Sequence, residues 1–440
     1  MIKLFDLSLK LNGYPIEEAK REYQRILDIP EADYAVYVDK KKKEIVQYHY
    51  NNNSFYRSLV GDKLPDKWED LPILTKRDLQ RPLKERLSKG FSERKVFINR
   101  TSGSSGDPFV FAKDKFCHAL TWASIIKRFG DHGINFNTSY QARFYGMPIS
   151  GRGYFFIRFK DFLSNRYRLS ILDFSDEGIE KIVKEFRKRK FTYINGYTSC
   201  IVQVAKYLQR KNVVLKDLCP SLQVCVVTSE MLFENDRKLI NDSLGVPLLN
   251  EYGSAESSVL AIENKHYEWQ LNTEDVFVEI LDEDNNSLNY GSPGSIVITS
   301  LYNKANPFIR YKIGDIGTIQ KLSEKKKILK NLEGRTNDFI LLPSGRKAAG
   351  MTFYSLTKAI MDEKGNIKEF KIVQKEVNKL ILQYSCDSEL SNEEKEKIRN
   401  EFNRYLEPGL VYIFERKDVL ERSTSGKLKQ FESLISSNFQ

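Results

Sequence analysis

Cysteine and histidine are scarce in this chain of 440 residues. The five cysteines are odd in number and contain no CxxC pair, so neither a disulfide framework nor a thiolate zinc site is expected. The four histidines are scattered and contain no HxxxH or HExxH pair, which gives a histidine-based metal site little support. A protein built around a metal centre of these residues is therefore disfavoured.

Long apolar runs are also missing. No stretch approaches the ~18 to 20 unbroken apolar residues of a membrane-spanning helix. Residues 1–27 lack the apolar core of a secretory signal and soon take on the pattern of a charged amphipathic helix. Repeats and low-complexity tracts are absent, yet hydrophobic residues make up 41% of the chain. We expect a cytoplasmic protein of two or three domains with no membrane span.

An excess of positive charge is the one imbalance of the composition. Lys and Arg total 70 against 59 Asp and Glu, a net charge of +11, which is compatible with a nucleic-acid partner. The basic runs are dispersed, however. Residues 40–43, between strand-like segments, and 325–327 are predicted hairpin tips, and 187–190 is predicted to end a helix. Dispersed clusters do not form one binding stripe, so no nucleic-acid partner is expected.

From about residue 173 the sequence alternates helix and strand patterns. Ser175 is a predicted helix N-cap, Gly245 is expected to follow the end of a later helix, and a turn is predicted at Asn195-Gly196. Strands separated by helices predict a parallel, doubly wound sheet, which binds ligands at the carboxyl ends of its strands. The predicted elements are helices after Ser175, over Ile201–Leu208 and over Phe233–Leu244, and the strands FTYI, QVCVV and VPLL.

The pattern changes near Trp269. Four short strands, VFVEIL, SIVITSL, FIRYKI and GTIQKL, predict an antiparallel β subdomain at about residues 269–333. Beyond Gly334, the strands FKIVQ, KLILQYS and LVYIF and a helix with the capping box Ser391–Glu394 predict a smaller unit. The predicted fold class is α/β, with a large N-terminal domain (1–334) and a small, mobile α+β C-terminal domain (335–440).

The segment TSGSSG, residues 101–106, is rich in glycine and hydroxyl groups. Two glycines let backbone N–H groups turn toward one point, and the hydroxyls add donors, as in loops that cradle phosphate. It is not a Walker A loop, because no GK[ST] follows. Taken alone, the segment is explained as well by a flexible Ser/Gly turn.

Four further segments carry polar residues suited to a nucleotide. In NEYGSAE, residues 250–256, the aromatic ring can stack on a base and the last carboxylate can hold Mg²⁺, or the segment is an ordinary strand-to-loop turn. In RYKIGD, residues 310–315, the carboxylate can accept bonds from ribose hydroxyls, or is a hairpin Asp. Residues 333–338, EGRTND, lie at the domain boundary. Residues 423–427, STSGK, place a lysine near the C-terminus that would otherwise be an exposed lysine.

In their order along the chain, TSGSSG, YGSAE, RYKIGD, GRTND and TSGK resemble the motifs of the adenylate-forming superfamily. That superfamily contains acyl-CoA synthetases, luciferases and peptide-synthetase adenylation domains. NPFIRYKIGD, FKIVQ and the length make the chain most similar to the phenylacetate-CoA ligase/CapK branch, whose members often occur in polysaccharide biosynthesis. The resemblance spans residues 100–431, and five motifs in the family's order argue against coincidence.

The resemblance implies a role for each matching position. The implied ATP-phosphate loop is Ser102, Gly103, Ser104, Ser105 and Gly106. Ser229 and Glu230 are implied to lie beside adenine and Tyr252 to stack on it, and Asn250 and Gly253 also belong to the implied nucleotide site. Asp315 is implied to bind ribose. The implied catalytic residues are Glu256, which binds Mg²⁺, Arg335, which reaches ribose or phosphate at the hinge, and Lys427, which contacts the α-phosphate and the substrate carboxylate.

The chain departs from the family's pattern at four places. Ala255 stands where Thr or Ser is usual, and Phe109 where a lysine often follows the phosphate loop. Asn337 occupies the usual Asp or Lys hinge position. LLPSGRKAAG, residues 341–350, replaces the glycine-rich stretch that commonly lines a pantetheine tunnel. The last two departures concern the second half-reaction.

The implied activity is that of an ATP-dependent ligase. A small-molecule carboxylic acid would react with ATP and Mg²⁺ to give acyl-AMP and pyrophosphate. Because the carboxylate is already ionised, no general base is needed. Positive charge at the α-phosphate would instead stabilise the transition state. The acyl group would pass to a thiol of coenzyme A or a carrier protein. An amine acceptor such as an amino sugar, which makes the enzyme an amide-forming ligase, is the alternative.

Two rival classes stay open. One is a catalytically silent homologue that keeps the nucleotide fold, against which the presence of both Glu256 and Lys427 argues. The other is a basic nucleic-acid-binding protein, which salt-dependent retention on DNA would reveal. The acid itself is not specified by the sequence, and the candidates for its pocket are Tyr145, Tyr197, Thr198 and Ser199.

Overall fold

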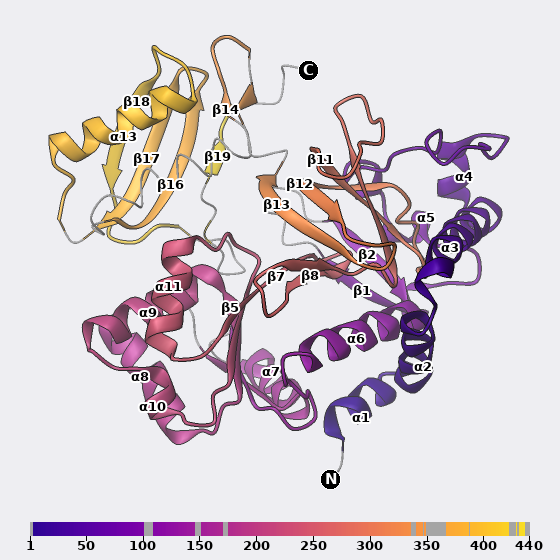
Figure 1. Cartoon of the computed structure of the whole chain (residues 1–440), viewed down its shortest axis with the longest axis horizontal. Coiled ribbons are helices and arrows are strands. Elements are labelled where there is room, and N and C mark those ends of the chain that lie inside the picture. Colours follow the sequence, from indigo (N-terminus) through magenta and orange to yellow (C-terminus); the bar gives the residue numbers. More distant parts are fainter. Residues whose placement is uncertain are drawn as a thin grey trace.

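The structure is a computed structural model of the whole chain. It describes residues 3–100, 109–145, 151–169, 175–335, 340–345, 347–348, 367–386, 388–421, 428 and 431–435. Figure 1 shows the N-terminus at one end of the molecule and a small C-terminal sheet at the other. In this described part, no helix is long and apolar enough to cross a bilayer.

An eleven-stranded mixed sheet organises most of the chain. The strand order is β10-β11-β12-β13-β9-β8-β7-β6-β5-β3-β4. The strands are β3 (Gln141–Phe144), β4 (Arg166–Leu169), β5 (Tyr193–Tyr197), β6 (Val224–Thr228), β7 (Leu248–Ser254), β8 (Ser258–Glu263), β9 (Trp269–Leu271), β10 (Val276–Leu281), β11 (Pro293–Ser300), β12 (Tyr311–Lys321) and β13 (Lys327–Arg335).

Strands β3 to β7 form the parallel half of this sheet. Successive residues of a strand point to opposite faces, and in β6 Cys225 and Val227 join one core while Val224 and Val226 join another. Helices α8 (Asp176–Lys188), α9 (Thr198–Arg210), α10 (Leu215–Leu218) and α11 (Glu234–Leu244) cover the first face, and α6 (Lys115–Gly130) covers the second. The predicted doubly wound parallel sheet is confirmed.

Strands β8 to β13 pair antiparallel and continue the same sheet. Their inner face packs around Phe111, Phe308 and Tyr311. The predicted subdomain is therefore not a separate sheet, because β9 pairs with β8 on one side and β13 on the other. FIRYKI and GTIQKL were predicted as two strands, but the chain from Tyr311 to Lys321 is one long strand, β12.

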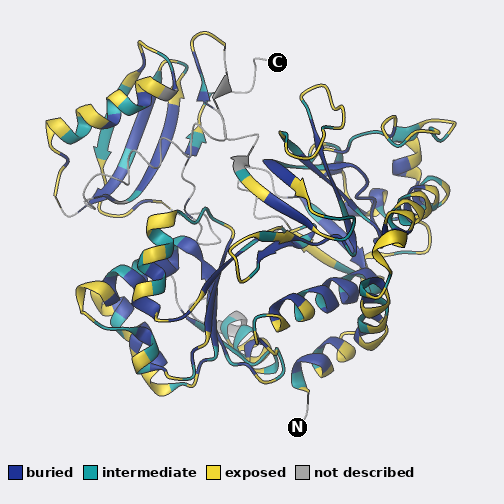
Figure 2. Cartoon of the chain, in the orientation of Figure 1, coloured by how far each residue is buried: buried dark blue, intermediate teal, exposed yellow. Residues whose placement is uncertain are grey.

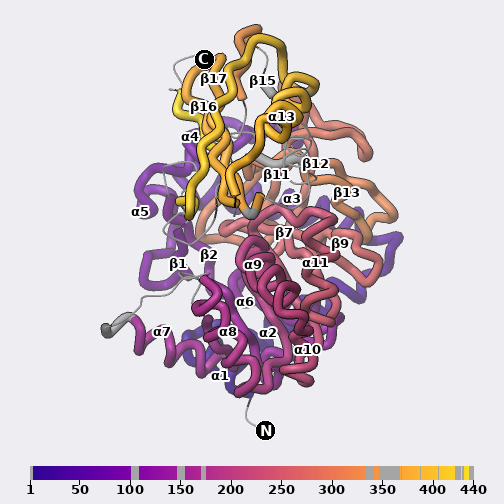
Figure 3. Tube along the Cα trace, turned by 90° about the vertical axis from the view of Figure 1, so that its left-hand side faces the viewer, coloured from indigo at the N-terminus to yellow at the C-terminus, as the bar shows by residue number. Residues whose placement is uncertain are grey.

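Helices of the first hundred residues pack against α6 and the antiparallel half. They are α1 (Leu4–Leu11), α2 (Ile16–Leu27), α3 (Glu31–Asn52), α4 (Ser54–Val60) and α5 (Leu83–Arg86), followed by the hairpin of β1 (Val96–Arg100) and β2 (Val110–Asp114). Helix α7 (Gly151–Leu163) lies between β3 and β4 in the sequence. Figure 3 shows α7 and α1 at the N-terminal end of the molecule.

Two local predictions were wrong. Residues 40–43 are not a hairpin tip but the middle of α3, because Lys41 and Lys42 lie on a helix face and stack over aromatic rings. Asn195-Gly196 is not a turn but part of β5. A Cβ on Gly196 would lie 2.5 Å from the Cβ of Phe144, so glycine is required there by close packing between strands.

The C-terminal sheet has the order β18-β17-β16-β19. Ser391 caps its helix through a complete capping box, as predicted. Ile398 and Phe402 of that helix pack on the sheet, while its outer turns are exposed. The elements of the chain after β13 are β14 (Ile340–Leu341), β15 (Lys347–Ala348), β16 (Ile367–Glu376), β17 (Lys379–Cys386), α13 (Asn392–Tyr405), β18 (Val411–Arg416) and β19 (Phe431–Ser433). The domain boundary at Gly334/Arg335 stays a prediction.

Candidate active site

Tyr252 and Asp315 meet where the two halves of the sheet join. Tyr252 lies near the carboxyl end of β7, and its hydroxyl donates to Asp315 Oδ2 at 2.8 Å. Its side chain is buried, with the ring centroid 6.2 Å from that of Trp269. The aromatic ring and the carboxylate, which come from separate motifs, therefore form one polar corner.

The backbone after Tyr252 requires a glycine. A Cβ on Gly253 would lie 2.0 Å from the carbonyl oxygen of Ser258, because β7 and β8 approach closely at a register shift. Asn250, earlier in β7, is buried, and both its backbone N–H and its backbone carbonyl form hydrogen bonds to side chains. Its N–H donates to Glu263 at 2.8 Å, and its carbonyl accepts from the Trp269 indole at 3.1 Å. The NEYG segment thus lies inside β7 rather than after it.

Glu256 lies just beyond β7 and faces β12. Its Oε1 accepts a hydrogen bond of 2.9 Å from the hydroxyl of Tyr311, a buried residue of the RYKIGD segment. Glu256 is half-buried, which leaves its carboxylate partly open to solvent. Asp315 lies four residues after Tyr311 on the same strand, so β12 contacts both carboxylate-bearing motifs.

Arg310, which directly precedes β12, anchors this part of the strand. Its side chain is fully buried, and its Nε and Nη2 both donate to Glu279 Oε1, at 3.1 and 3.0 Å. A further bond of 3.0 Å runs from Nη1 to the carbonyl of Leu71. A buried arginine with these partners holds the strand in place, and sequence reasoning had assigned no role to this residue.

Glu230 connects the N-terminal part of the chain to its C-terminal end. Its Oε2 accepts from the Ser199 backbone N–H at 2.7 Å, at the start of α9, where a negative charge is favoured. Its Oε1 accepts from the backbone N–H of Leu428 at 3.3 Å. Ser229 has a φ of 70°, a conformation that favours glycine, which is the residue that the resemblance expects at this position.

Several predicted site residues lie outside the described residues: Ser102, Gly103, Ser104, Ser105, Gly106, Asn337 and Lys427. The backbone of Arg335 pairs with that of Asp315 in the register of β12 and β13, which brings two motifs to neighbouring positions. Leu428, one residue beyond Lys427, is buried and contacts Glu230. The described part of the site thus combines residues from the second, third and fourth motifs with Leu428, which directly follows the fifth.

A second polar group follows the carboxyl ends of β3, β5, β6 and β7. The Thr228 hydroxyl donates to Glu251 Oε1 at 3.0 Å, and removal from water raises the pKa of Glu251 despite that bond and the charge of Arg143. The Arg143 guanidinium lies 4.1 Å from the Tyr145 ring centroid, and among the residues that the structure describes its buried Nε has no hydrogen-bond partner. The ring of Tyr145 lies 4.7 Å from that of Tyr197.

Sequence reasoning nominated the two tyrosines as pocket residues and missed Arg143. The signal that could have found it is its place in the strand QARF, whose carboxyl end lies on the ligand-binding edge of a parallel sheet. In the described part of the chain, no group of three or more His, Cys, Asp or Glu residues is arranged to hold a metal.

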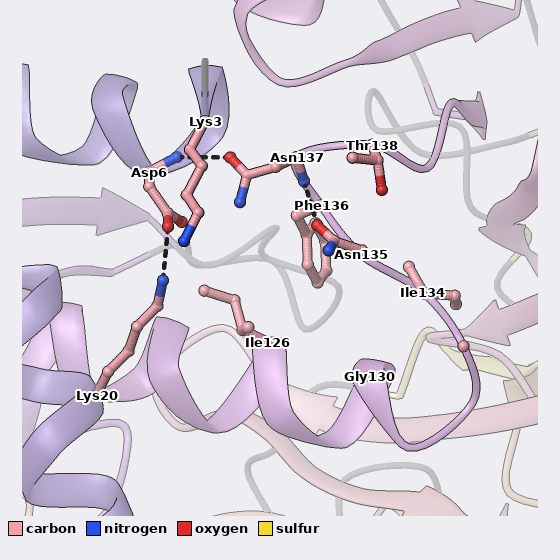
Figure 4. A pocket seen from close by; sticks show the side chains of 11 residues that line it. Lys3, Asp6, Lys20, Ile126, Gly130, Ile134, Asn135, Phe136, Asn137 and Thr138 are labelled. Atoms are coloured by element: carbon pink, nitrogen blue, oxygen red, sulfur yellow. Dashed lines mark hydrogen bonds and ion pairs between the residues drawn. The ribbon is translucent and has the colours of Figure 1, made fainter. Parts of the chain in front are cut away.

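A cavity of about 460 Å³ lies elsewhere, between α1, α2 and the residues that follow α6 (Figure 4). Asp6 is buried there; its carboxylate accepts from Lys20 Nζ at 2.6 Å, and its backbone N–H donates to Asn137 Oδ1 at 3.2 Å. None of the motif residues lines this cavity. It is therefore separate from the candidate active site.

The chain resembles known proteins along most of its length, although no family model matches it. Protein CapK of Staphylococcus aureus is 23% identical over 402 residues, which covers 88% of this chain and 86% of CapK. A phenylacetate-coenzyme A ligase of Thermus thermophilus is 25% identical over 299 residues, covering 63% of this chain and 64% of that ligase.

Among solved structures, 2-hydroxyisobutyryl-CoA ligase in its postadenylation state, in complex with 2-HIB-AMP, matches with a TM-score of 0.68. The identity is 15%, and the match covers 92% of this chain and 90% of the ligase. The same ligase in its thioesterification state gives a TM-score of 0.56 over similar coverage. The chain therefore shares the fold of this ligase, and its sequence is similar to that of CapK over most of its length and to those of phenylacetate-coenzyme A ligases over about two thirds of it.

Proposed function

We propose that the chain is an ATP-dependent ligase that activates a carboxylic acid as its acyl-AMP. The observation that carries the proposal is the pairing of Tyr252 with Asp315 beside the pairing of Glu256 with Tyr311. These contacts place an aromatic ring and two carboxylates, from motifs far apart in the sequence, at the carboxyl end of a parallel strand, where such sheets bind nucleotides.

The proposed nucleotide site follows from those contacts. The Tyr252 ring would stack on adenine, with Ser229, Glu230, Asn250 and Gly253 around the base. Asp315 would accept bonds from ribose hydroxyls, because the Tyr252 hydroxyl fixes the orientation of its carboxylate. The loop from Ser102 to Gly106 would hold the phosphates through backbone N–H groups, and Arg335 would reach ribose or phosphate.

The donor set at Glu256 fits Mg²⁺. Magnesium is usually bound through one or two carboxylates together with substrate phosphates and water. Glu256 offers one half-buried carboxylate, held toward β12 by Tyr311. When bound, the ion would supply positive charge to the phosphates, and Glu256 would orient it.

The proposed first half-reaction forms the acyl-AMP. A carboxylate oxygen of the acid bonds to the α-phosphorus of ATP while the bond to the bridging oxygen breaks, and pyrophosphate leaves with the electron pair. Lys427 would neutralise the charge that develops on the α-phosphate. The contact between Leu428 and Glu230 supports this role, because it brings the chain next to Lys427 to the adenine side of the site.

The proposed second half-reaction passes the acyl group to a thiol of coenzyme A or a carrier protein. The thiol sulfur bonds to the acyl carbon, AMP leaves, and the thiol proton goes to solvent. Similarity to phenylacetate-coenzyme A ligases supports this acceptor. We place the reaction in polysaccharide biosynthesis, so deletion of the encoding gene should remove an acyl-derived substituent from a cell-surface polysaccharide.

The decisive experiment is a pyrophosphate-exchange screen over a library of carboxylic acids. One acid should support exchange, and Lys427→Ala should reduce that exchange by at least ~10²-fold, the scale of a lost contact to transition-state charge. ATP binding should change less. The exposed Lys265→Ala is the matched control and should exchange at the wild-type rate.

Two results would contradict the proposal. One is an absence of exchange with every acid although the folded protein binds ATP, which would indicate the catalytically silent homologue. The other is wild-type exchange by Lys427→Ala. Once an acid is known, parallel reactions with coenzyme A and with amino sugars distinguish the thiol acceptor from the amine acceptor.

A further inference from the structure

Helix α7 exposes an aromatic face. Four of its phenylalanines are largely solvent-accessible: Phe155 at 72%, Phe156 at 59%, Phe159 at 59% and Phe162 at 67%. Among the residues that the structure describes, no other element exposes more than two large hydrophobic side chains. Exposed apolar residues that cluster in this way mark a surface that binds something, whereas single ones need no explanation.

The four side chains form one stripe along the helix. Phe155, Phe159 and Phe162 are spaced by four and three residues, the repeat that lines one side of an α-helix, and Phe156 lies at the border of that stripe. The opposite side of the helix is occupied by its own protein. Asp161 on that side is 1% exposed and forms ion pairs with Arg166 at 2.7 Å and Arg168 at 3.2 Å, both of β4.

Cations border the stripe on both sides. By helical spacing Arg158 falls at one edge of the phenylalanine stripe and Lys160 at the other. Lys160 Nζ lies 4.4 Å from the Phe156 ring centroid, and the Arg158 guanidinium lies 4.3 Å from that of Tyr167. Residues 151–169 contain five Lys and Arg and one acidic residue, Asp161. The ion pairs of Asp161 with Arg166 and Arg168 neutralise its charge. The remaining charge of this segment is therefore positive.

We propose that α7 docks the protein onto an anionic lipid surface. An interfacial helix combines Phe or Leu on one face, which enters the boundary between headgroups and acyl chains, with Lys and Arg beside it that pair with anionic headgroups. The aromatic stripe and its flanking cations match both parts of that surface. A convex helix face suits a flat bilayer, and the net charge of +11 adds long-range attraction to it.

The position of α7 permits this contact. Figures 1 and 3 place α7 at the same end of the molecule as α1, which it contacts, and away from the C-terminal sheet. Leu7 and Leu11 of α1 are exposed as well, at 42% and 76%. A bilayer at this end would lie away from the C-terminal sheet.

The test is co-sedimentation of the full chain with lipid vesicles. One set contains phosphatidylcholine alone, and the other contains equal parts of phosphatidylcholine and phosphatidylglycerol. We expect binding to the anionic set to exceed binding to the neutral set at least ~10-fold, and to weaken as salt is raised. The double variant Phe155→Glu/Phe159→Glu should reduce binding to anionic vesicles at least ~10-fold.

The matched control is Leu322→Glu/Val419→Glu, which adds the same charge at two other exposed apolar residues. It should bind like the wild type apart from a small electrostatic loss. Circular dichroism melting should show that both double variants are folded. Because the changed residues are exposed and outside the candidate site, pyrophosphate exchange without vesicles should also be unchanged.

Three outcomes would overturn the proposal. The wild type does not sediment with anionic vesicles; or both double variants lose binding equally, so that net charge and not α7 is responsible; or light scattering shows a wild-type dimer that Phe155→Glu/Phe159→Glu dissociates, which assigns the stripe to contact between two copies. Failure here leaves the acyl-AMP reaction untouched, since the exchange assay uses no lipid.

Discussion

The hydrogen bond between Tyr252 and Asp315 joins residues 63 positions apart in the sequence. It fixes the rotation of the tyrosine ring and points one carboxylate edge toward it. A ligand that stacks on the ring and bonds the carboxylate would therefore meet groups that are already oriented, which lowers the entropy cost of binding.

This arrangement gives a prediction for ATP affinity. Asp315→Asn removes the charge that would accept both ribose hydroxyls, so we expect the KM for ATP in pyrophosphate exchange to rise at least ~10-fold, the scale of a hydrogen bond to a charged group. Tyr252→Phe keeps the ring and loses only the bond to Asp315, so its effect should be smaller.

Tyr290→Phe is the control, because Tyr290 is an exposed tyrosine away from these motifs. Its KM for ATP should equal that of the wild type. An unchanged KM in Asp315→Asn would show that Asp315 serves only to hold Tyr252.

Glu256 carries a prediction about the metal. In Glu256→Gln, the amide oxygen can still accept the Tyr311 hydroxyl, so the fold should be retained. An amide is a poorer ligand for Mg²⁺ than a carboxylate, so the half-saturating Mg²⁺ concentration should rise several-fold. The exposed Glu268→Gln serves as control. If the two magnesium titrations coincide, Glu256 is a turn residue.

The sequence pointed to residues that stand in recognisable polar motifs. It did not point to residues whose role depends on the partners they meet in the folded chain. Tyr252, Glu256 and Asp315 stand in short polar motifs, so the sequence nominated them, and their roles stay predictions. Arg310 stands in the same RYKIGD motif as Asp315. Its role, however, depends on Glu279 and on the carbonyl of Leu71, which only folding brings next to it. Arg143 is likewise defined by Tyr145 and Glu251, and no spacing rule connects those three.

At the scale of single elements, α3 contains the buried His49. Its Nε2 lies 2.8 Å from the carbonyl of Asn303 and its Nδ1 lies 3.2 Å from the Ser88 hydroxyl. Burial lowers the pKa of His49 to about 4, because the charged imidazolium would lose its hydration. The helix is therefore fixed to the body of the protein through a neutral histidine.

This gives a prediction about acid stability. Above pH 6.5 both folded and unfolded His49 are neutral. Between pH 6.5 and 4 the unfolded chain binds a proton that the folded chain does not, so stability falls as the pH is lowered, by up to ~3 kcal/mol. Urea unfolding across this range should show less of that loss in His49→Gln. The exposed His266→Gln should retain the wild-type pH dependence, and equal curves for all three proteins would exclude His49.

Elements with local signals were predicted well. Gly245 ends α11 with a φ of 67°, and Ser175 and Ser391 cap their helices, because each signal acts within four residues. The hairpin predicted at residues 40–43 and the turn predicted at Asn195-Gly196 were wrong. The conformations of these segments depend on aromatic rings and on a strand that are distant in the sequence. The joining of both halves into one sheet through β9 was missed for the same reason.

At the scale of the whole molecule, the link between the C-terminal sheet and the rest of the chain includes the contact of Leu428 with Glu230. If Lys427 acts in the first half-reaction, it occupies space that an acyl acceptor needs in the second. We therefore propose that the C-terminal domain from about Arg335 rotates between the two steps, as hinged domains do through a few boundary residues.

The hinge prediction concerns Asn337. Asn337→Pro fixes φ near −65°, so one half-reaction should be spared more than the other. The measurement compares pyrophosphate exchange with acyl transfer, using the acid that the screen identifies. Asn337→Ala, which keeps the backbone free, should affect neither step. Equal losses of both rates in folded Asn337→Pro, or no loss, would place the hinge elsewhere.

Strand β9, only three residues long, has a consequence for how the protein is made. As the chain leaves the ribosome at about 5 to 20 residues per second, β8 and β9 are complete before β13 exists. For some seconds one edge of β9 has no partner, and an open strand edge attracts other nascent chains. Slow translation through residues 272–335, or a truncation before β13, should therefore send the protein into aggregates. Chaperone dependence should begin when β9 emerges and end once β13 has been synthesised.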